Sequence, residues 1–183
     1  MRGPSRFGKR YEMLELTPTK LKRLYNAMSA IASSKATHNP FKGAIYFYNG
    51  CLYATDSFSI VRVELSWAEG VGEYGHLYVV EDIDDKGHFT IGEDAVCERY
   101  NASGHADTLA RMFEPDMTEP ESRVGSDCKY LLPVLKCFNA LKLPVTFSQD
   151  SKRLFMSTAR TVKFERYQWL VRMDAIVMHV RLP

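Results

Sequence analysis

Basic side chains at helical spacing are the residues of this 183-residue sequence that most clearly indicate a chemistry. They lie in two apolar-periodic segments, one from Thr17 to about Ser33 and the other from Tyr130 to Lys142. On the side away from the apolar residues lie Lys22 and Arg23 in the first segment, and Lys136 with the preceding Lys129 in the second. Lysine and arginine aimed at phosphates bind a nucleic acid without reading its sequence. Solvated faces without a partner are the alternative.

Charge is unevenly distributed along the chain, although 24 Lys and Arg nearly balance 22 Asp and Glu. Residues 1–35 carry a net charge of +6 and residues 128–183 carry +7, whereas residues 81–127 carry −9. A protein with basic ends and an acidic middle can present one positive face to a polyanion and remain nearly neutral overall. Charge alone leaves the solvated alternative open.

No catalytic, metal or cofactor site is indicated. The five histidines have no metal-ligand spacing, the four cysteines form no CxxC pair, and no nucleophile motif is present. Residues 82–93 place Gly87 and Glu93 as a calcium loop does, but Lys86 replaces an oxygen ligand and the flanks indicate strands, so an acidic hairpin is the alternative. We therefore expect no enzyme activity, no metal and no cofactor.

Composition predicts one globular domain in the cytoplasm. The chain is 45% apolar, has no run of about 20 apolar residues, and shows no apolar stretch behind its basic start. We expect a flexible basic arm at residues 1–12, then a single domain at 13–183 with an acidic insertion at about 66–127. Aromatic Tyr46, Phe47, Tyr48 and Tyr53 could form a stacking platform for single-stranded DNA, although strand aromatics usually pack in a core.

Two similar units are predicted to position the basic residues, each a helix followed by antiparallel strands. Thr17 is a good N-cap and Pro18 suits the first helical position. Strands are expected at 44–48, 51–55 and 58–65, joined by an Asn49-Gly50 type I′ turn and by Asp56-Ser57. The second unit has a helix at 130–142, whose start Pro133 leaves ambiguous, and strands at 145–148, 154–158 and up to 175–182. The insertion is expected to hold a hairpin at 76–83 and 88–91, a short helix at 107–113 and a loop at 114–126. The class is α+β.

Several segments resemble the bacterial DNA polymerase III beta sliding clamp family. These are Leu21-Lys-Arg-Leu24, the Leu52-Tyr-Ala-Thr-Asp56 strand and turn, Tyr130-Leu-Leu132 with Asn139-Ala-Leu-Lys142, and the terminal Val177-Met-His-Val-Arg-Leu182. The resemblance covers residues 14–65 and 128–183. It implies a DNA-clamp (processivity-fold) domain with two helices packed on antiparallel sheets. It also implies that the four basic residues face duplex DNA.

The same resemblance implies a cleft for partner peptides. Its expected lining is Thr55, Ile60, Val177, Met178, Val180 and Leu182. Where the family has glycine, histidine and arginine after the ATD turn, this chain has Ser57, Phe58 and Ser59, and His179 replaces the terminal proline.

The function expected from the resemblance is that of a sliding-clamp-like processivity or recruitment factor in DNA replication or repair. Its partners would be duplex DNA, a DNA polymerase or other replication proteins, and further copies of the chain. Family clamps close a ring of six domains, whereas this chain has room for one. The alternative is a non-ring regulatory or adaptor protein of the same fold that binds replication proteins, and a sequence-tolerant single-strand binder is a third interpretation.

Overall fold

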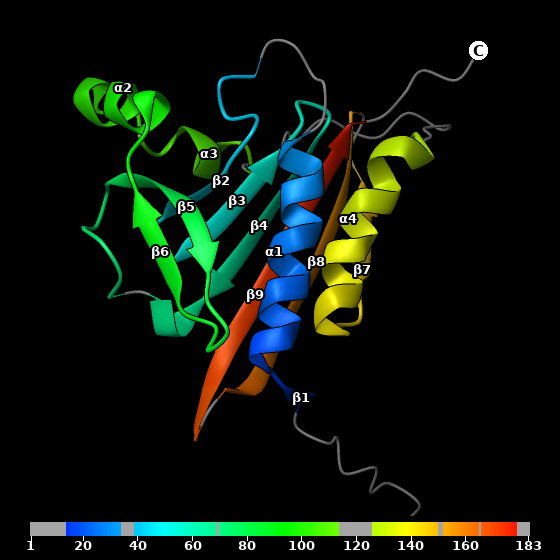
Figure 1. Ribbon diagram of the computed structural model, residues 1–183. Coiled ribbons are helices and arrows are strands. Elements are labelled where there is room, and N and C mark those ends of the chain that lie inside the picture. Colours follow the sequence, from blue (N-terminus) through cyan, green and yellow to red (C-terminus); the bar gives the residue numbers. More distant parts are fainter. Residues whose placement is uncertain are drawn as a thin grey trace, which may run out of the picture.

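The computed structural model describes residues 14–33, 39–68, 70–113, 126–149, 152–164 and 166–178. Within them, two helices lie side by side on one face of a mostly antiparallel sheet, and two shorter helices lie on the other side (Figure 1). The protein is therefore α+β, as the sequence predicts. The expected arm at residues 1–12 falls outside the described residues.

The elements follow one another in three groups along the chain. The first unit comprises β1 (Leu14–Glu15), α1 (Pro18–Ala32), β2 (Ile45–Tyr48), β3 (Cys51–Thr55) and β4 (Ser59–Leu65). The insertion holds η1 (Ser66–Ala68), β5 (Leu77–Ile83), β6 (Phe89–Gly92), α2 (Ala95–Ser103) and α3 (Thr108–Arg111). The second unit comprises α4 (Cys128–Leu141), β7 (Thr146–Gln149), β8 (Arg153–Phe164) and β9 (Tyr167–Met178).

Local signals in the sequence set the bounds of the first unit. The Thr17 hydroxyl accepts a hydrogen bond from the backbone N–H of Lys20, which satisfies one of the free donors at the start of α1. Asn49 and Gly50 both have positive φ, as a type I′ turn requires. In the next turn, Asp56 Oδ1 accepts from the backbone N–H groups of Phe58 and Ser59. The predicted helix and hairpins are confirmed.

The two units join through their last strands. β4 pairs antiparallel with β9, from Ser59 opposite Val177 to Leu65 opposite Val171. The strand order across this seam is β7-β8-β9-β4-β3-β2, so each unit contributes a three-strand meander in mirrored order. β1 pairs parallel with β8, and β5 and β6 extend the sheet beyond β2. The acidic insertion is thus continuous with the sheet.

Two apolar cores stabilise the sheet, one on each face. The larger core lies under α1 and α4 and contains Leu24, Met28, Val134, Phe138 and the inward residues of the strands. The smaller core lies under α2 and α3 and contains Tyr46, Leu77, Cys97 and Leu109. Because helices cover both faces at β2 and β3, every residue of β2 is buried. None of the described helices combines the length and apolarity needed to cross a membrane.

Three features differ from the sequence prediction. Helix α4 begins at Cys128, where Asp127 Oδ1 accepts from the backbone N–H of Lys129, so Pro133 lies inside the helix instead of delaying its start. Helix α2 was not predicted, although its Asp94 N-cap and Gly104 C-cap are readable signals. The last two strands are also longer than expected, because one hairpin of two twelve-residue strands replaces several short strands.

Replacing Pro133 should stabilise the protein. A proline inside a helix has no N–H to donate to the carbonyl four residues earlier, and its ring crowds that carbonyl. We expect Pro133→Ala to raise the free energy of unfolding by about 1 to 3 kcal/mol in urea denaturation. Asn139→Ala, an exposed change in the same helix, should raise it by a few tenths of a kcal/mol at most. A lower stability of Pro133→Ala would mean that packing of the ring outweighs the missing hydrogen bond.

Candidate nucleic-acid interface

The outward side of the α1 and α4 layer carries the predicted basic residues. Neither helix contains an acidic residue. Arg23, Lys129 and Lys136 are exposed, and the apolar residues of both helices face the sheet. The structure therefore brings basic residues from the two ends of the sequence to one layer of the molecule.

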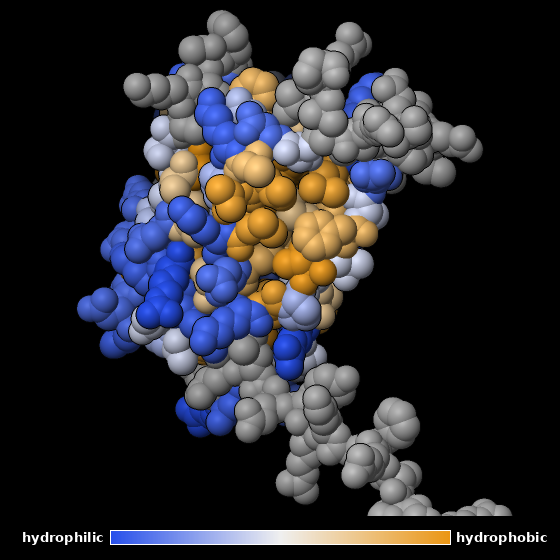
Figure 2. All heavy atoms as spheres, turned by 90° about the vertical axis from the view of Figure 1, so that its right-hand side faces the viewer, coloured by the Kyte–Doolittle hydropathy of each residue, from blue (hydrophilic) through white to orange (hydrophobic). Residues whose placement is uncertain are grey.

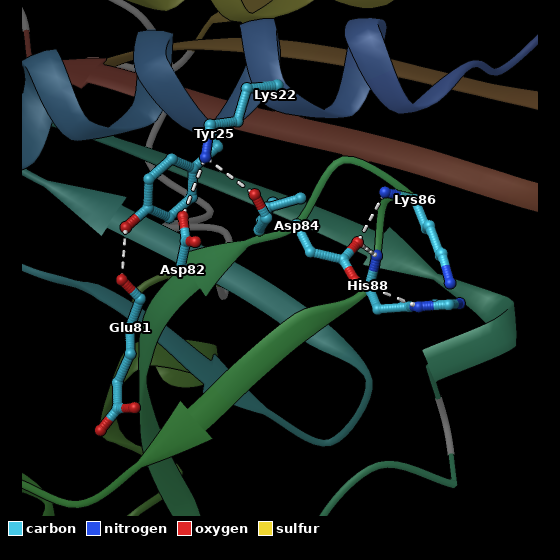
Figure 3. A network of polar contacts seen from close by, with 8 residues as sticks. Lys22, Tyr25, Glu81, Asp82, Asp84, Lys86 and His88 are labelled. Carbon is cyan, nitrogen blue, oxygen red and sulfur yellow. Dashed lines mark hydrogen bonds and ion pairs between the residues drawn. The ribbon is translucent and has the colours of Figure 1, made fainter.

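Lys22 is the exception, because the insertion engages it. Its Nζ donates to Asp82 Oδ1 and to the backbone carbonyl of Ile83, both at 2.8 Å (Figure 3). Next to it, the Tyr25 hydroxyl donates to the carbonyl of Glu81. The hydrogen bond from Lys22 lowers the pKa of Asp82, and the same bond raises the pKa of Lys22. Lys22 can reach a phosphate only if it leaves Asp82.

The other three basic residues differ from Lys22. No carboxylate in the described part of the chain forms an ion pair with Arg23, Lys129 or Lys136. The Lys129 ammonium lies 5.2 Å from the ring centroid of Tyr130. These three side chains are the exposed cations of the layer.

The acidic hairpin between β5 and β6 uses its carboxylates internally. Asp84 Oδ1 accepts from the backbone N–H groups of Lys86 and His88, which lowers the pKa of Asp84 (Figure 3). Asp82 is bound to Lys22. Among the described residues, no group of three or more His, Cys, Asp or Glu side chains could hold a metal ion. The structure favours the acidic hairpin over the calcium loop.

An open groove of about 840 Å³ lies between the turn after β3 and the end of β9. Three of the predicted cleft residues, Thr55, Ile60 and Met178, line it. Val177 does not, because its side chain is fully buried in the core under the helices, and Ile176 lines the groove instead. Val180 and Leu182 lie outside the described residues. Successive side chains of a strand point to opposite faces, so Val177 and Met178 cannot both line the groove. The prediction of the cleft did not use this signal.

The mouth of this groove combines apolar and basic side chains. Phe58 is 45% exposed and stacks on Tyr130, with ring centroids 4.6 Å apart, which links the groove to the start of α4. Ser57, which stands where the family has glycine, has a φ of +80°. Arg111, Lys152 and Arg153 also line the groove. A peptide with an apolar anchor and acidic neighbours would match these surroundings.

The aromatic platform suggested by the sequence is wrong. Tyr46, Phe47, Tyr48 and Tyr53 are all at least 92% buried. Phe47 packs under α1, whereas the three tyrosines belong to the smaller core under α2 and α3. Burial raises the pKa of Tyr46 and Tyr53 well above the ordinary value for tyrosine. These rings stabilise the sheet and cannot stack on a nucleobase.

Comparison with known proteins gives no relative. No family model, no curated protein and no solved structure matches this chain.

Removing the Lys22 ammonium should change the titration of Asp82 alone. In Lys22→Gln the carboxylate of Asp82 loses the cation that holds its charged form, so its pKa should rise toward the ordinary aspartate value. Asp84 is a matched control, because backbone N–H groups hold its charge and its pKa should stay low. Carbon-detected NMR titration of the side-chain carboxyls measures both. An unchanged Asp82 pKa would contradict the ion pair.

Proposed function

We propose that this protein is a clamp-like factor that lies along duplex DNA with its α1 and α4 layer and recruits replication or repair proteins. The observation that carries this proposal is the pair of acid-free helices that present Arg23, Lys129 and Lys136 to solvent. Phosphate contacts from such residues are independent of sequence and weaken steeply with salt, which suits a protein that must move along DNA.

The arrangement of charge around the sheet supports this orientation. The helix layer holds five basic residues and no acid in α1 and α4, whereas residues 70–113 hold nine acidic and three basic residues. That acidic segment forms the β5–β6 edge of the sheet and the α2 and α3 side (Figure 1). A polyanion would be attracted to the helix layer and repelled by the opposite side, which fixes how the protein faces DNA.

Edge strands provide a means of assembly. β7 and β6 lie at opposite ends of the sheet, and neither Thr146–Gln149 nor Phe89–Gly92 contains a charged residue. All four residues of β7 are exposed. Uncharged edge strands readily pair with another chain.

The surroundings of the two edges favour head-to-tail contact between copies. Apolar side chains gather on the side of the molecule that carries α4 and β7 (Figure 2), and they include Leu132 and Phe147, each 57% exposed. Lys142 lies between α4 and β7, whereas Glu93 and Asp94 directly follow β6. Opposite charges at the two edges favour β7 of one copy against β6 of the next, the geometry that can close a ring.

The groove supplies the recruitment step of the proposal. Ile60, Ile176 and Met178 give the groove an apolar lining. Lys152 and Arg153 suit an acidic flank of a partner peptide, whereas Arg111 is already paired with Asp107. The lining comes from strand ends and loops, and none of the lining residues belongs to α1 or α4.

The alternative is a non-ring adaptor or regulator that binds replication proteins through the same groove. The contact of Lys22 with Asp82 favours this alternative, because it reduces the number of helix cations open to DNA. The two functions differ in whether the protein binds duplex DNA at all.

Charge reversal on the helix layer should abolish duplex binding. We expect the triple variant Arg23→Glu, Lys129→Glu, Lys136→Glu to lose association with a fluorescent duplex in anisotropy titrations. In single replacements by Gln, the slope of log affinity against log salt should shrink by about 0.9 for each lost phosphate contact. All three side chains are exposed, so the fold should remain intact.

A matched triple variant controls for net charge. Lys42, Lys86 and Arg99 are also exposed and lie outside α1 and α4. Replacing these three with Glu changes the net charge equally and should leave most duplex affinity. Equal losses in the two triple variants would reject the helix layer as the DNA-facing side, and no duplex binding by the wild type would favour the adaptor.

A lysine on β7 should disrupt assembly. We expect Phe147→Lys to lower the mass measured by size-exclusion chromatography with light scattering, because a charge on an edge strand blocks pairing. Tyr74→Lys is the control, since Tyr74 is 92% exposed and lies in the loop before β5. A strictly monomeric wild type, with and without DNA, would remove the ring from the proposal.

A further inference from the structure

The hairpin formed by β8 and β9 extends beyond the rest of the sheet. β9 pairs with β4 only between Val171 and Val177, whereas β8 and β9 continue to pair as far as Phe164 opposite Tyr167. Short β1 pairs with Val162 and Lys163 of β8 near this end. Residues 161–164 and 166–170 therefore form a tip that projects past β4 (Figure 1).

Aromatic rings gather at this tip. Trp67 of η1 stacks on Phe164 with centroids 4.8 Å apart, and Trp169 meets Trp67 at 6.2 Å. Tyr167 meets Trp169 edge to face at 6.1 Å and is itself 55% exposed. Phe164 is buried and the two tryptophans are half-buried, so the cluster packs on the protein core through Phe164 and exposes Tyr167 to solvent.

The tip is also basic. Residues 161–170 contain two basic residues, Lys163 and Arg166, and one acid, Glu165. The Arg166 guanidinium lies 5.7 Å from the ring centroid of Tyr167. Lys163 is exposed on the opposite face of the same hairpin, and Arg172, farther along β9, is paired with Asp174. An exposed aromatic ring beside a cation matches the two parts of a nucleotide, its flat base and its charged phosphate.

We propose that the β8–β9 tip binds single-stranded nucleic acid, with Tyr167 stacking on a base and Arg166 contacting the adjacent phosphate. Bases inside a duplex already stack on one another, so a projecting ring finds a free base face only in a single strand or at a duplex end. The site is separate from the α1 and α4 layer and does not depend on duplex binding. Stacking tolerates any base, so the tip distinguishes single strands from duplex but does not read the base sequence.

The test uses the full-length protein and a 16-residue oligothymidylate. The chain has two tryptophans, Trp67 and Trp169, and both lie in this cluster. A stacked base should therefore quench intrinsic tryptophan fluorescence as the oligonucleotide binds. Tyr167→Ala should weaken binding about tenfold, while Tyr167→Phe, which keeps the ring, should bind as the wild type does.

Two controls separate stacking from charge. An abasic oligonucleotide of equal length retains the phosphates and should bind the wild type about as weakly as oligothymidylate binds Tyr167→Ala. Tyr74→Ala, which removes an exposed ring elsewhere, should bind oligothymidylate normally. The charge reversal of Arg23, Lys129 and Lys136 should leave oligothymidylate binding largely intact, so failure of the duplex proposal and failure of this one are distinguishable.

Three results would overturn the inference. They are equal affinity for abasic and base-bearing strands, unchanged binding by Tyr167→Ala, and no binding of oligothymidylate by the wild type. The last result would assign the aromatic tip to a protein partner instead of a nucleic acid.

Discussion

The pairing of β4 with β9 is the interaction on which the rest of the structure depends. Residues 59–65 and 171–177 are more than one hundred positions apart, yet their ladder joins the two meanders into one sheet. Each helix precedes its own meander, so this seam also brings α1 and α4 together over one face. Without it, basic residues from the two ends of the chain would not share a layer. Side-chain alternation in β9 then decides which residues meet the helices and which meet the groove.

The acidic insertion balances this basic layer in two ways. Among the described residues, Glu93, Asp94, Glu98 and Asp107 lie in or beside β6, α2 and α3, where they would oppose the approach of a polyanion from that side. Asp82, however, reaches α1 and holds Lys22. Both partners are substantially exposed, with side-chain accessibilities of 43% and 64%, so solvent screens the pair and a phosphate can compete for Lys22.

The sequence predicted most elements that local chemistry defines, with α2 as the exception, and it missed contacts that depend on long-range placement. Thr17 with Pro18, Asn49 with Gly50 and Asp56 define their own caps and turns, so those elements were found. Pro133 left the start of α4 ambiguous in the prediction, whereas in the structure the apolar face of α4 and the Asp127 cap outweigh the cost of one proline. The aromatic residues of β2 and β3 could not be assigned to a core until α2 and α3 were known to cover them. The pairing of Lys22 with Asp82 likewise depends on β5 lying beside α1, which no local pattern encodes.

The weakness of exposed cations limits how one copy of this chain can act on DNA. Arg23, Lys129 and Lys136 are solvated, and at physiological salt charges beyond about 8 Å are largely screened. A few such contacts give an affinity that salt readily removes. In the proposed function, lasting association with DNA would therefore need several copies bound together, since linked weak contacts multiply without any new interaction. This requirement makes the uncharged edges at β6 and β7 as important to the proposed function as the basic helices, because only paired edges would place one helix layer beside the next.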